Sequence, residues 1–345
     1  MNIIIKKGLI LDIPSSLKKL KISQAFSKTH AKTFAIITDS KVRRLYGGKL
    51  LWNLRKVGFN AEIFSFTEGE KSKNLSTVGN LAEQMAEKGF DRSSCIIALG
   101  GGVVGDIAGL LASTFMRGIP YIQVPTTLLA MIDSSIGGKT GVNLEHGKNL
   151  FGTFYQPKSI FIDPYLLKTL PQKQLKNGLA EAIKYGVIKD TKLFKFIEKN
   201  SKKILNLSLK SNLKIAENLV RQCVKIKVEI VKKDEKETSL RQILNYGHTF
   251  GHAIEKMSNY TLLHGFAISI GMVLANQKAV ELKIFKKSDA DRIKNLLKKA
   301  GLPVYTMHKP TLKDIVSDKK KHGETLNFIL PKKIGEVIIY KEKIS

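Results

Sequence analysis

The sequence predicts an α/β domain built on a parallel β-sheet, followed by a mostly helical, all-α type domain. Short β-branched runs alternate with helical patterns in the first half of the chain. Helical patterns then continue almost to the C-terminus. The first texture is typical of parallel strands joined by crossover helices. We place the boundary near residue 170, which gives domains at residues 1–170 and 171–345.

Four strands and three helices are predicted in the first domain. The third strand, Cys95–Leu99, is apolar throughout, as expected of a strand covered on both faces of a parallel sheet. One helix carries Val78, Leu81 and Met85 on a single face, with the spacing of an amphipathic helix. The predicted strands are 34–38, 62–66, 95–99 and 121–124, and the predicted helices are 50–57, 75–88 and 106–115.

The second domain begins after Pro171, where the strand-like runs stop. Its predicted helices are 179–188, 193–197, 204–231, 244–256, 265–279 and 289–300. A strand pair, 325–330 and 336–340 with a turn at 331–335, is expected to close the chain. The sequence contains no internal repeat.

The composition of the 345-residue chain is that of an ordinary globular protein, with 43% apolar and 8% aromatic residues. Ile3–Ile5 is followed at once by lysines, so it is too short for a secretory signal. No apolar run approaches the roughly 20 residues that span a bilayer. Cys95 and Cys223 share no CxxC spacing, and we expect both to be reduced. These features favour a cytoplasmic protein without membrane association.

The formal net charge is +29, from 58 Lys and Arg, of which 8 are Arg, against 29 Asp and Glu. One interpretation is an anionic macromolecular partner, such as nucleic acid. The other is a lysine-rich surface with no such partner. We favour the second because the lysines are scattered and arginine, the better reader of phosphates and bases, is scarce. We expect no specific nucleic-acid binding, although the charge would attract small anions.

A glycine-rich turn follows the third predicted strand and opens a helix. Gly100, Gly102 and Gly105 fit the pattern G-x-G-x-x-G, in which the backbone approaches a pyrophosphate at a helix N-terminus. The turn departs from the usual dinucleotide fingerprint because it follows the third strand and no acidic residue ends the next one. The acid able to bind a ribose is Asp39, at the end of the first predicted strand. A Rossmann-like sheet with a rearranged cofactor site is therefore predicted, with a plain tight turn as the alternative.

Two polar stretches lie near this turn in the predicted order of strands. Residues 68–73 end the second strand and can line the same crevice, or form an ordinary solvated turn. Residues 133–149 are predicted to form a flexible loop that presents Lys139, Lys148 and Asn149 to an anion. An ATP-binding P-loop is excluded, because Asp133 stands where that motif requires its first glycine.

Three of the seven histidines fall between residues 248 and 264. His248 and His252 are four residues apart, so they share one face of a helix, and His264 follows beyond it. Imidazoles in this arrangement suit a divalent transition metal. An ordinary histidine pair near a helix end is the alternative.

Upstream residues extend these possibilities. Glu181 and Lys184 are three apart on a predicted helix, either as a surface ion pair or with Glu181 as an oxygen ligand and Lys184 facing a substrate. Lys227, Arg241 and Asn245 precede His248 on what is predicted to be one helical run, and they could converge on an anion.

These motifs together resemble the 3-dehydroquinate synthase family over nearly the whole chain. The segments that carry the resemblance are Gly69–Glu70 with Lys73, Gly100–Asp106, Phe115–Gly118, Pro125–Thr127, Asp133–Lys139, Gly147–Asn149, Glu181–Lys184, Asp234–Glu235, Asn245–His252, Leu263–Gly265 and Asp318–Lys320. The resemblance implies an N-terminal Rossmann-like domain that binds NAD and a C-terminal helical domain that binds a metal, with the active site between them. It also implies a homodimer.

The resemblance assigns roles to individual residues. It makes Glu181, His248 and His264 the ligands of one divalent metal ion, zinc or cobalt, while His252 faces the substrate. The residues that it implies around NAD are Asp39, Glu68, Gly69, Glu70, Lys71, Ser72, Lys73, Gly101, Gly102, Val103, Val104, Gly105, Asp106, Thr126, Thr127, Lys139 and Lys148.

The substrate residues also follow from the resemblance. The implied phosphate pocket consists of Arg117, which a second subunit could supply, Lys139, Asn149, His252 and Lys319 or Lys320, of which we favour Lys320. Lys227 and Arg241 would pair with a carboxylate, and Asp133 would also contact the substrate. The implied catalytic residues are His252, Lys184, Lys139 and Asn245.

The implied reaction converts 3-deoxy-D-arabino-heptulosonate 7-phosphate to 3-dehydroquinate and phosphate. It proceeds by NAD-mediated transient oxidation, phosphate elimination, re-reduction, ring opening and an intramolecular aldol closure. Two other enzymes share part of the pattern. A metal-dependent polyol dehydrogenase would need no lysine-rich phosphate site, and a 2-deoxy-scyllo-inosose synthase would have no substrate carboxylate for Lys227 and Arg241.

Overall fold

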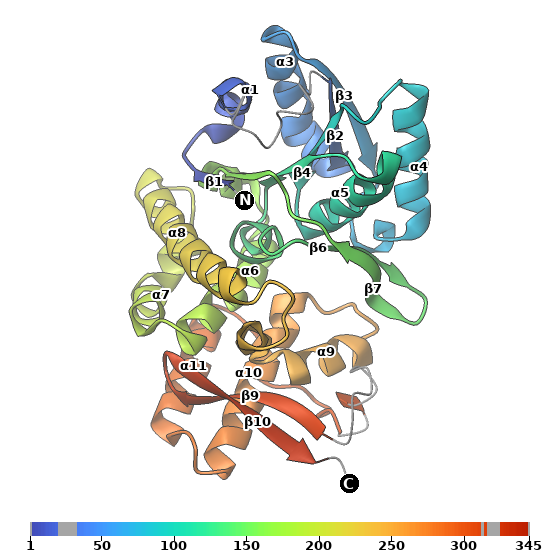
Figure 1. Cartoon of the computed structure of the whole chain (residues 1–345). Coiled ribbons are helices and arrows are strands. Elements are labelled where there is room, and N and C mark those ends of the chain that lie inside the picture. The colour runs from blue at the N-terminus through green and yellow to red at the C-terminus, as the bar shows by residue number, and fades with distance from the viewer. Residues whose placement is uncertain (1, 20–32, 312–313, 316–324, 344–345) are drawn as a thin grey trace. The chain divides into compact units, whose positions relative to one another are not determined.

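The computed structural model describes residues 2–19, 33–311, 314–315 and 325–343 of the chain (Figure 1). It separates into two compact units, Met1–Thr169 and Leu170–Ser345. The expected assignment of dinucleotide binding to the first unit and metal binding to the second stays a prediction.

The first unit contains a six-stranded parallel sheet with the strand order β1-β8-β5-β4-β2-β3. Its strands are β1 (Asn2–Ile5), β2 (Thr33–Asp39), β3 (Asn60–Phe66), β4 (Cys95–Gly100), β5 (Tyr121–Pro125) and β8 (Ser159–Ile162). The expected parallel α/β sheet is confirmed. β1 and β8 were not predicted from the sequence; each is only four residues long.

The strand order explains the unusual position of the glycine turn. β3 lies on one side of β2 and β4 lies on the other, so the order of strands reverses between β2 and β4. In open α/β sheets, ligands bind outside the carboxyl ends of the strands at such a reversal. Asp39 ends β2, and the turn at Gly100 ends the neighbouring β4. The two predicted cofactor elements therefore lie at the carboxyl ends of adjacent strands.

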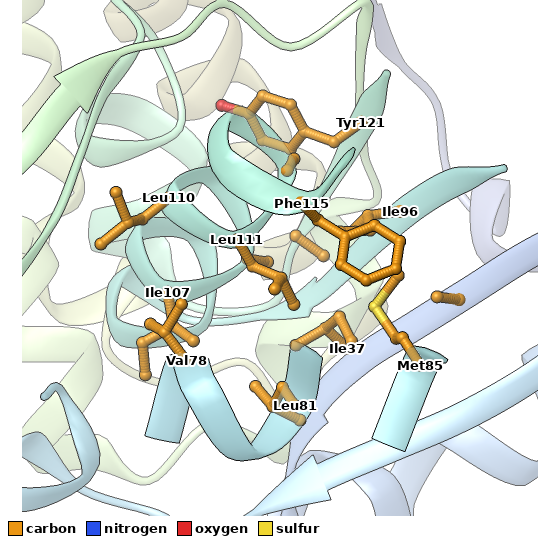
Figure 2. Close-up of a cluster of buried hydrophobic side chains, with 14 of the residues drawn as sticks. Ile37, Val78, Leu81, Met85, Ile96, Ile107, Leu110, Leu111, Phe115 and Tyr121 are labelled. Carbon is orange, nitrogen blue, oxygen red and sulfur yellow. The ribbon is translucent and has the colours of Figure 1, made fainter. Parts of the chain in front are cut away.

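Helices cover the sheet and complete the core of the first unit. They are α1 (Leu9–Lys19), α2 (Ser40–Val42), α3 (Gly48–Lys56), α4 (Leu75–Glu87) and α5 (Gly102–Thr114). Figure 2 shows Val78, Leu81 and Met85 of α4 facing Ile107 and Leu111 of α5, within a buried cluster that includes the sheet. α5 starts four residues earlier than expected, at the glycine turn itself, and it is apolar on most sides because it is buried.

A β-hairpin replaces the flexible loop that was expected at residues 133–149, so that expectation is wrong. β6 (Lys139–Leu144) pairs antiparallel with β7 (Gly147–Phe154), and Asp133 lies in the preceding helical turn, Ala130–Ser134. The two strands pack so closely that a Cβ on Gly152 would overlap the carbonyl oxygen of Thr140. The many glycines and polar residues hid the strand pattern, yet they are what permits this contact.

The second unit is mostly helical, as predicted. Its elements are α6 (Gln172–Ile188), α7 (Thr191–Ile204), α8 (Lys210–Lys233), α9 (His248–Met257), α10 (His264–Glu281), α11 (Lys287–Lys299) and the antiparallel hairpin β9 (Thr325–Lys333) and β10 (Glu336–Lys343). Within the described residues, none of the helices combines the length and the apolar character needed to cross a bilayer.

Two predicted helices are interrupted in the structure. The run 204–231 is divided after α7, where Asn206 accepts hydrogen bonds from Ser208 and Asn212 that compete with helix formation. The run 244–256 starts instead at His248, because Gly247 has a φ of 80° and follows a short 3₁₀ segment, Leu240–Asn245. Arg241 and Asn245 therefore do not share a helix with His248, and Lys227 belongs to α8.

Glycines allow α9 and α10 to approach each other closely. A Cβ on Gly251 would lie 2.6 Å from the side chain of Ile268. A Cβ on Gly271 would overlap the carbonyl oxygen of Gly247 and lie 2.8 Å from the backbone nitrogen of Gly251. The first turns of these two helices are therefore held at a fixed separation.

Replacing Gly271 with alanine should destabilise the protein, because the added methyl group meets backbone atoms that cannot move independently. Overpacking of this kind costs about 1–3 kcal/mol, and each kcal/mol lowers Tm by about 2–4 °C in a unit of this size. Calorimetry would measure the shift. The control is Gly79→Ala on α4, where an added Cβ meets nothing within 4 Å and the helix should gain slightly. Equal Tm values for Gly271→Ala and the unsubstituted protein would contradict the close packing.

Candidate functional site

Three helices of the second unit each contribute one residue to a cluster of possible metal ligands. Glu181 lies in the middle of α6, His248 is the first residue of α9, and His264 is the first residue of α10. The positions of the two histidines follow from the residues before them. Gly247 adopts a left-handed conformation, and Leu263 is extended, so each helix begins at its histidine.

The donor atoms of this cluster converge. The Nε2 atoms of His248 and His264 lie 3.6 Å and 3.5 Å from the same oxygen, Oε1 of Glu181. All three donor atoms lie within 4.8 Å of one another, and Glu181 is fully buried. Tetrahedral ligands at the usual zinc–nitrogen distance of about 2.0–2.1 Å stand roughly 3.3 Å apart. The separation and chemistry of these donors fit a divalent metal ion.

Acceptors on the far side of each ring orient both histidines. Nδ1 of His264 lies 3.2 Å from Oε2 of Glu255, and Nδ1 of His248 lies 3.1 Å from the carbonyl oxygen of Tyr246. Metal-binding histidines usually donate their second N–H to such an acceptor, which fixes the tautomer. Glu255 was not predicted from the sequence. Its spacing, three residues after His252 on the same helix, was the available signal.

The electrostatics of the cluster suit a cation. Burial would lower the pKa of His264, but its hydrogen bonds to Glu181 and Glu255 raise that pKa to about 10. Burial, together with the charge of Lys184, holds the pKa of His248 well below its ordinary value. The carboxylates of Glu181 and Glu255 therefore stabilise a positive charge at His264, as they would stabilise a metal ion.

Lys184 pairs with Glu181 inside the unit. Its Nζ contacts Oε2 of Glu181, and the two side chains are 2% and 0% exposed. The alternative of a surface ion pair is therefore wrong. Lys184 contacts Oε2 of Glu181, while the two histidines approach Oε1. The ion pair therefore leaves Oε1 accessible to the histidines.

α6 and the start of α10 are joined by a direct contact beside the cluster. The backbone N–H of Gly265 donates to Oδ1 of Asn177, at 2.6 Å. A Cβ on Gly265 would overlap the carbonyl oxygen of Asn177. Asn177 precedes Glu181 by one helical turn, so this contact fixes His264 relative to Glu181.

Lys227, Arg241 and Asn245, which were expected to bind an anion, lie on two elements of the second unit, α8 and the 3₁₀ segment Leu240–Asn245. Lys227 is a buried residue of α8. Asn245 donates to Oε1 of Glu237 at 2.8 Å, and Nε of Arg241 lies 3.9 Å from Oε2 of the same residue. The structure thus brings Arg241 and Asn245 together through Glu237, which the sequence analysis did not identify. Lys319 and Lys320 lie outside the described residues.

A carboxylate holds the loop before Arg241 in place. Asp234 accepts hydrogen bonds from the backbone N–H groups of Arg241, Ser239 and Thr238. Burial raises the pKa of Asp234, but these donors outweigh that effect and leave the pKa well below its ordinary value. Arg241 itself is buried, and its guanidinium also donates to the carbonyl oxygen of Glu235.

His252 lies beside the metal-ligand candidates on α9. Its ring centroid is 5.3 Å from that of His248 and 6.1 Å from that of His264. The expectation that His248 and His252 share a helix face is confirmed. His252, Glu255 and His264 also form a second group of donor atoms within 4.8 Å of one another.

In the first unit, the glycine turn provides backbone donors for an anion. Gly101 precedes α5 without a side-chain cap, and Gly102, Val103 and Val104 form the first turn of the helix. A Cβ on Gly101 would lie 3.0 Å from the side chain of Thr127, and a Cβ on Gly102 would lie 3.1 Å from the side chain of Ser134. Such a turn suits a pyrophosphate, because unpaired N–H groups and the helix dipole attract negative charge.

The turns after β4 and β5 are hydrogen-bonded to each other. The backbone N–H of Thr126 donates to the carbonyl oxygen of Gly100 at 2.9 Å, and Thr127 Oγ1 accepts from the backbone N–H of Ala130 at 3.1 Å. A Cβ on Gly105 would lie only 2.8 Å from the side chain of Gln123 on β5, so α5 packs tightly on the sheet. These contacts fix the position of the helix N-terminus.

Asp39 has a structural role that the sequence analysis did not assign. Its Oδ1 accepts from the backbone N–H groups of Lys41 and Val42 at 2.9 and 2.8 Å, and so caps α2. Burial raises its pKa above the ordinary value, against the effect of these hydrogen bonds. Ser40, the next residue, accepts from the backbone N–H of Glu68 at 3.2 Å, which joins the turns after β2 and β3.

Lys73 links three of the expected cofactor and substrate elements. Its Nζ lies 2.5 Å from Oδ2 of Asp106 on α5 and 2.5 Å from Oδ1 of Asn149 on β7. The amide of Asn143 on β6 donates to Oε1 of Glu70 at 2.8 Å. Burial lowers the pKa of Lys73, but the carboxylates of Asp106 and Glu70 outweigh it and raise the pKa.

The other expected residues of the first unit lie at its surface or partly so. Gly69 has a φ of 114°, which favours glycine, and Ser72 donates to the carbonyl oxygen of Thr67. Arg117 is exposed in a turn with a φ of 66°. The remaining residues are Glu68 and Lys71 in the turn after β3, Asp133 in its helical turn, Lys139 at the start of β6 and Lys148 on β7.

Comparison with known proteins identifies the family of this chain. Residues 63–177 match the family model for the N-terminal part of 3-dehydroquinate synthase, and residues 178–322 match that for the C-terminal part. The chain is 46% identical over 347 residues to the 3-dehydroquinate synthase of Prochlorococcus marinus subsp. pastoris, covering 99% of this chain and 93% of the relative.

Solved structures of related enzymes resemble the chain throughout its length. A 2-epi-5-epi-valiolone synthase from Streptomyces hygroscopicus subsp. jinggangensis, with NAD⁺ and Zn²⁺ bound, is 28% identical, with a TM-score of 0.85, covering 99% of this chain and 92% of that one. A 2-deoxy-scyllo-inosose synthase, complexed with carbaglucose-6-phosphate, NAD⁺ and Co²⁺, is 29% identical, with the same TM-score and coverage. By its nearly full-length similarity and its two matching family models, the chain belongs to the 3-dehydroquinate synthase family.

Proposed function

We propose that this protein is an NAD- and metal-dependent 3-dehydroquinate synthase, a phosphate-eliminating carbon–oxygen lyase. It converts 3-deoxy-D-arabino-heptulosonate 7-phosphate to 3-dehydroquinate and phosphate, the second step of the shikimate pathway. The convergence of Glu181, His248 and His264 on one point, in a chain of this family, carries the proposal.

Glu181, His248 and His264 hold the metal in this proposal. One carboxylate oxygen and two Nε2 atoms supply three ligands, which leaves coordination positions for substrate oxygens. A divalent ion there acts as a Lewis acid, which lowers the pKa of a substrate hydroxyl group. The structurally similar synthases have zinc or cobalt bound, and either ion suits this donor set.

The turns at the carboxyl ends of β2 to β5 hold NAD. The backbone N–H groups at Gly101–Gly105 bind the pyrophosphate, and Asp39 binds a ribose hydroxyl group. The segment Glu68–Lys73, with Asp106, Thr126, Thr127, Lys139 and Lys148, surrounds the rest of the cofactor. When bound there, NAD would supply a hydride acceptor that can return the hydride within the same turnover.

Cationic side chains hold the two ends of the anionic substrate. Arg117, Lys139, Asn149, His252 and Lys320 bind the phosphate, and Lys227 and Arg241 bind the carboxylate. Burial of Lys227 and Arg241 strengthens their attraction for a carboxylate, because a site shielded from water has a low dielectric constant and screens charges poorly. The substrate carboxylate distinguishes this reaction from that of a 2-deoxy-scyllo-inosose synthase, and the phosphate distinguishes it from that of a polyol dehydrogenase.

The remaining catalytic residues act on protons and on orientation. His252, beside the metal ligands, transfers protons at the reacting part of the substrate. Lys184 acts from its buried pair with Glu181, and Asn245, held by Glu237, orients the substrate together with Asp133. We also propose a homodimer in the cytoplasm, without specific nucleic-acid or membrane partners.

Removing a metal ligand should strip the ion. His264→Ala and Glu181→Ala leave two protein ligands, and both metal content and phosphate release should fall at least tenfold. Elemental analysis after dialysis would measure the metal. The control is His308→Ala, which alters an exposed histidine of the same unit. His252→Ala should keep its metal and lose turnover. A full complement of metal in either ligand variant would disprove the assignment.

Lys227→Ala should weaken binding of the substrate through its carboxylate. Loss of one partner from a desolvated charge pair costs about 2–5 kcal/mol, or roughly 30- to 4,000-fold in Kd. Calorimetry at fixed salt would compare a carboxylated substrate analogue with inorganic phosphate, whose affinity should not change. Lys225→Ala, on the exposed face of the same helix, is the matched control. Unchanged affinity for the carboxylated analogue would remove Lys227 from the site.

The redox balance separates a synthase from a dehydrogenase. Phosphate release should require NAD, yet many phosphates should appear per NAD supplied, without a lasting rise in NADH absorbance. The reason is that the hydride returns to the same molecule from which it was taken. Phosphate assay and absorbance would be followed in one reaction. Stoichiometric accumulation of NADH without phosphate release would identify a dehydrogenase instead.

A further inference from the structure

We propose that Glu255 is a positioning residue for the metal centre: by accepting a hydrogen bond from Nδ1 of His264, it directs Nε2 of His264 toward Glu181 and so sets the metal affinity. This inference rests on the proposed metal-binding role of Glu181, His248 and His264. Glu255 itself would contact neither the substrate nor the ion.

The geometry that carries the proposal involves both nitrogens of one imidazole ring. Nδ1 of His264 lies 3.2 Å from Oε2 of Glu255, and Nε2 lies 3.5 Å from Oε1 of Glu181. A neutral imidazole has one N–H and one lone pair. If the proton is on Nδ1, the Nδ1–H group donates a hydrogen bond to Glu255. The lone pair is then on Nε2, which faces the other ligands. Glu255 thus selects the tautomer that can bind a metal.

The ring of His264 is oriented by a side chain, whereas the ring of His248 is oriented by the backbone. His248 follows Gly247 directly and receives its acceptor from the nearby backbone, at the carbonyl oxygen of Tyr246. Tyr246 is buried, and its hydroxyl group is hydrogen-bonded to Asn276 on α10, so this carbonyl is firmly held. His264 receives its acceptor from a side chain on a different helix, α9. A single substitution can therefore remove the acceptor of His264 without changing the backbone.

Burial makes the contact effective. The side chain of Glu255 is 5% exposed, and that of His264 is 29% exposed. A buried carboxylate is costly without a partner, so Glu255 is strongly held in the geometry that serves His264. Acceptors of this kind change metal affinity by about 10- to 100-fold in other metal sites.

A second arrangement uses the same residues. The donor atoms of His252, Glu255 and His264 also lie within 4.8 Å of one another, so Glu255 could be a ligand of an ion bound through Nδ1 of His264. The hydrogen bond is the better interpretation, because 3.2 Å is an ordinary hydrogen-bond distance and because Nδ1 of His248 has an equivalent acceptor. The stoichiometry of metal binding distinguishes the two.

The test measures the Kd of the purified, metal-stripped protein for Co²⁺ and Zn²⁺ by competition with a chromophoric chelator, and records the cobalt absorption spectrum. Glu255→Ala should bind both ions about 10- to 100-fold more weakly and show an altered cobalt spectrum. Glu255→Gln keeps an acceptor oxygen and should lose less than tenfold. Saturating zinc should restore turnover of the alanine variant, which a misfolded protein would not show.

The matched control is Ser269→Ala on α10. Ser269 is fully buried and donates to the carbonyl oxygens of Phe266 and Pro303, but it does not belong to the ligand cluster. This variant should lower Tm and leave the metal Kd unchanged. If Glu255→Ala binds cobalt with the affinity and spectrum of the unsubstituted protein, the proposal is overturned.

Two further outcomes separate this inference from the proposed function. Two ions per chain in the unsubstituted protein, one of them lost in Glu255→Ala, would make Glu255 a ligand and overturn the positioning role. Failure of the unsubstituted protein to bind any divalent ion would instead remove the proposed metal site, and the inference with it.

Discussion

The buried carboxylate of Glu181 is the group on which the organisation of the second unit depends. A carboxylate removed from water is strongly unfavourable unless charges and hydrogen bonds compensate it. Lys184 compensates it from the same helix, while the two imidazoles approach from α9 and α10. The glycine contacts and the Asn177–Gly265 hydrogen bond help to hold the three helices, and so these partners, in place.

A different buried charge organises the carboxyl edge of the sheet in the first unit. Lys73 connects the turn after β3 with α5 and the β6–β7 hairpin, through Asp106 and Asn149. Segments that are already ordered before a ligand binds lose less conformational entropy on binding. The glycine turn benefits in the same way, since the neighbouring turn at Thr126 is hydrogen-bonded to it. The first unit therefore presents its backbone donors on a rigid edge.

Much of this architecture was predictable from the sequence, because local patterns determine it. Apolar runs identified the central strands, and the glycine turn, the acid at Asp39 and the histidine spacing identified the candidate sites. Features that depend on tertiary contacts were missed. The β6–β7 hairpin appeared as a polar loop, since its strand pattern is obscured by glycines that fit a close backbone approach. Glu255 was not identified, because the fold brings His264 to it from a different helix.

The donors of the candidate metal site come from positions far apart in the sequence, on α6, α9 and α10. An ion bound by all three therefore acts as a reversible cross-link between helices, comparable to a disulfide that can be loaded and unloaded. A ligand that binds only the folded state stabilises it by RT ln(1 + [L]/Kd), which is about 2.7 kcal/mol at a hundredfold excess over Kd. The lifetime of the folded chain would then follow the free metal concentration in the cell, so metal scarcity would reduce the amount of the enzyme as well as its occupancy.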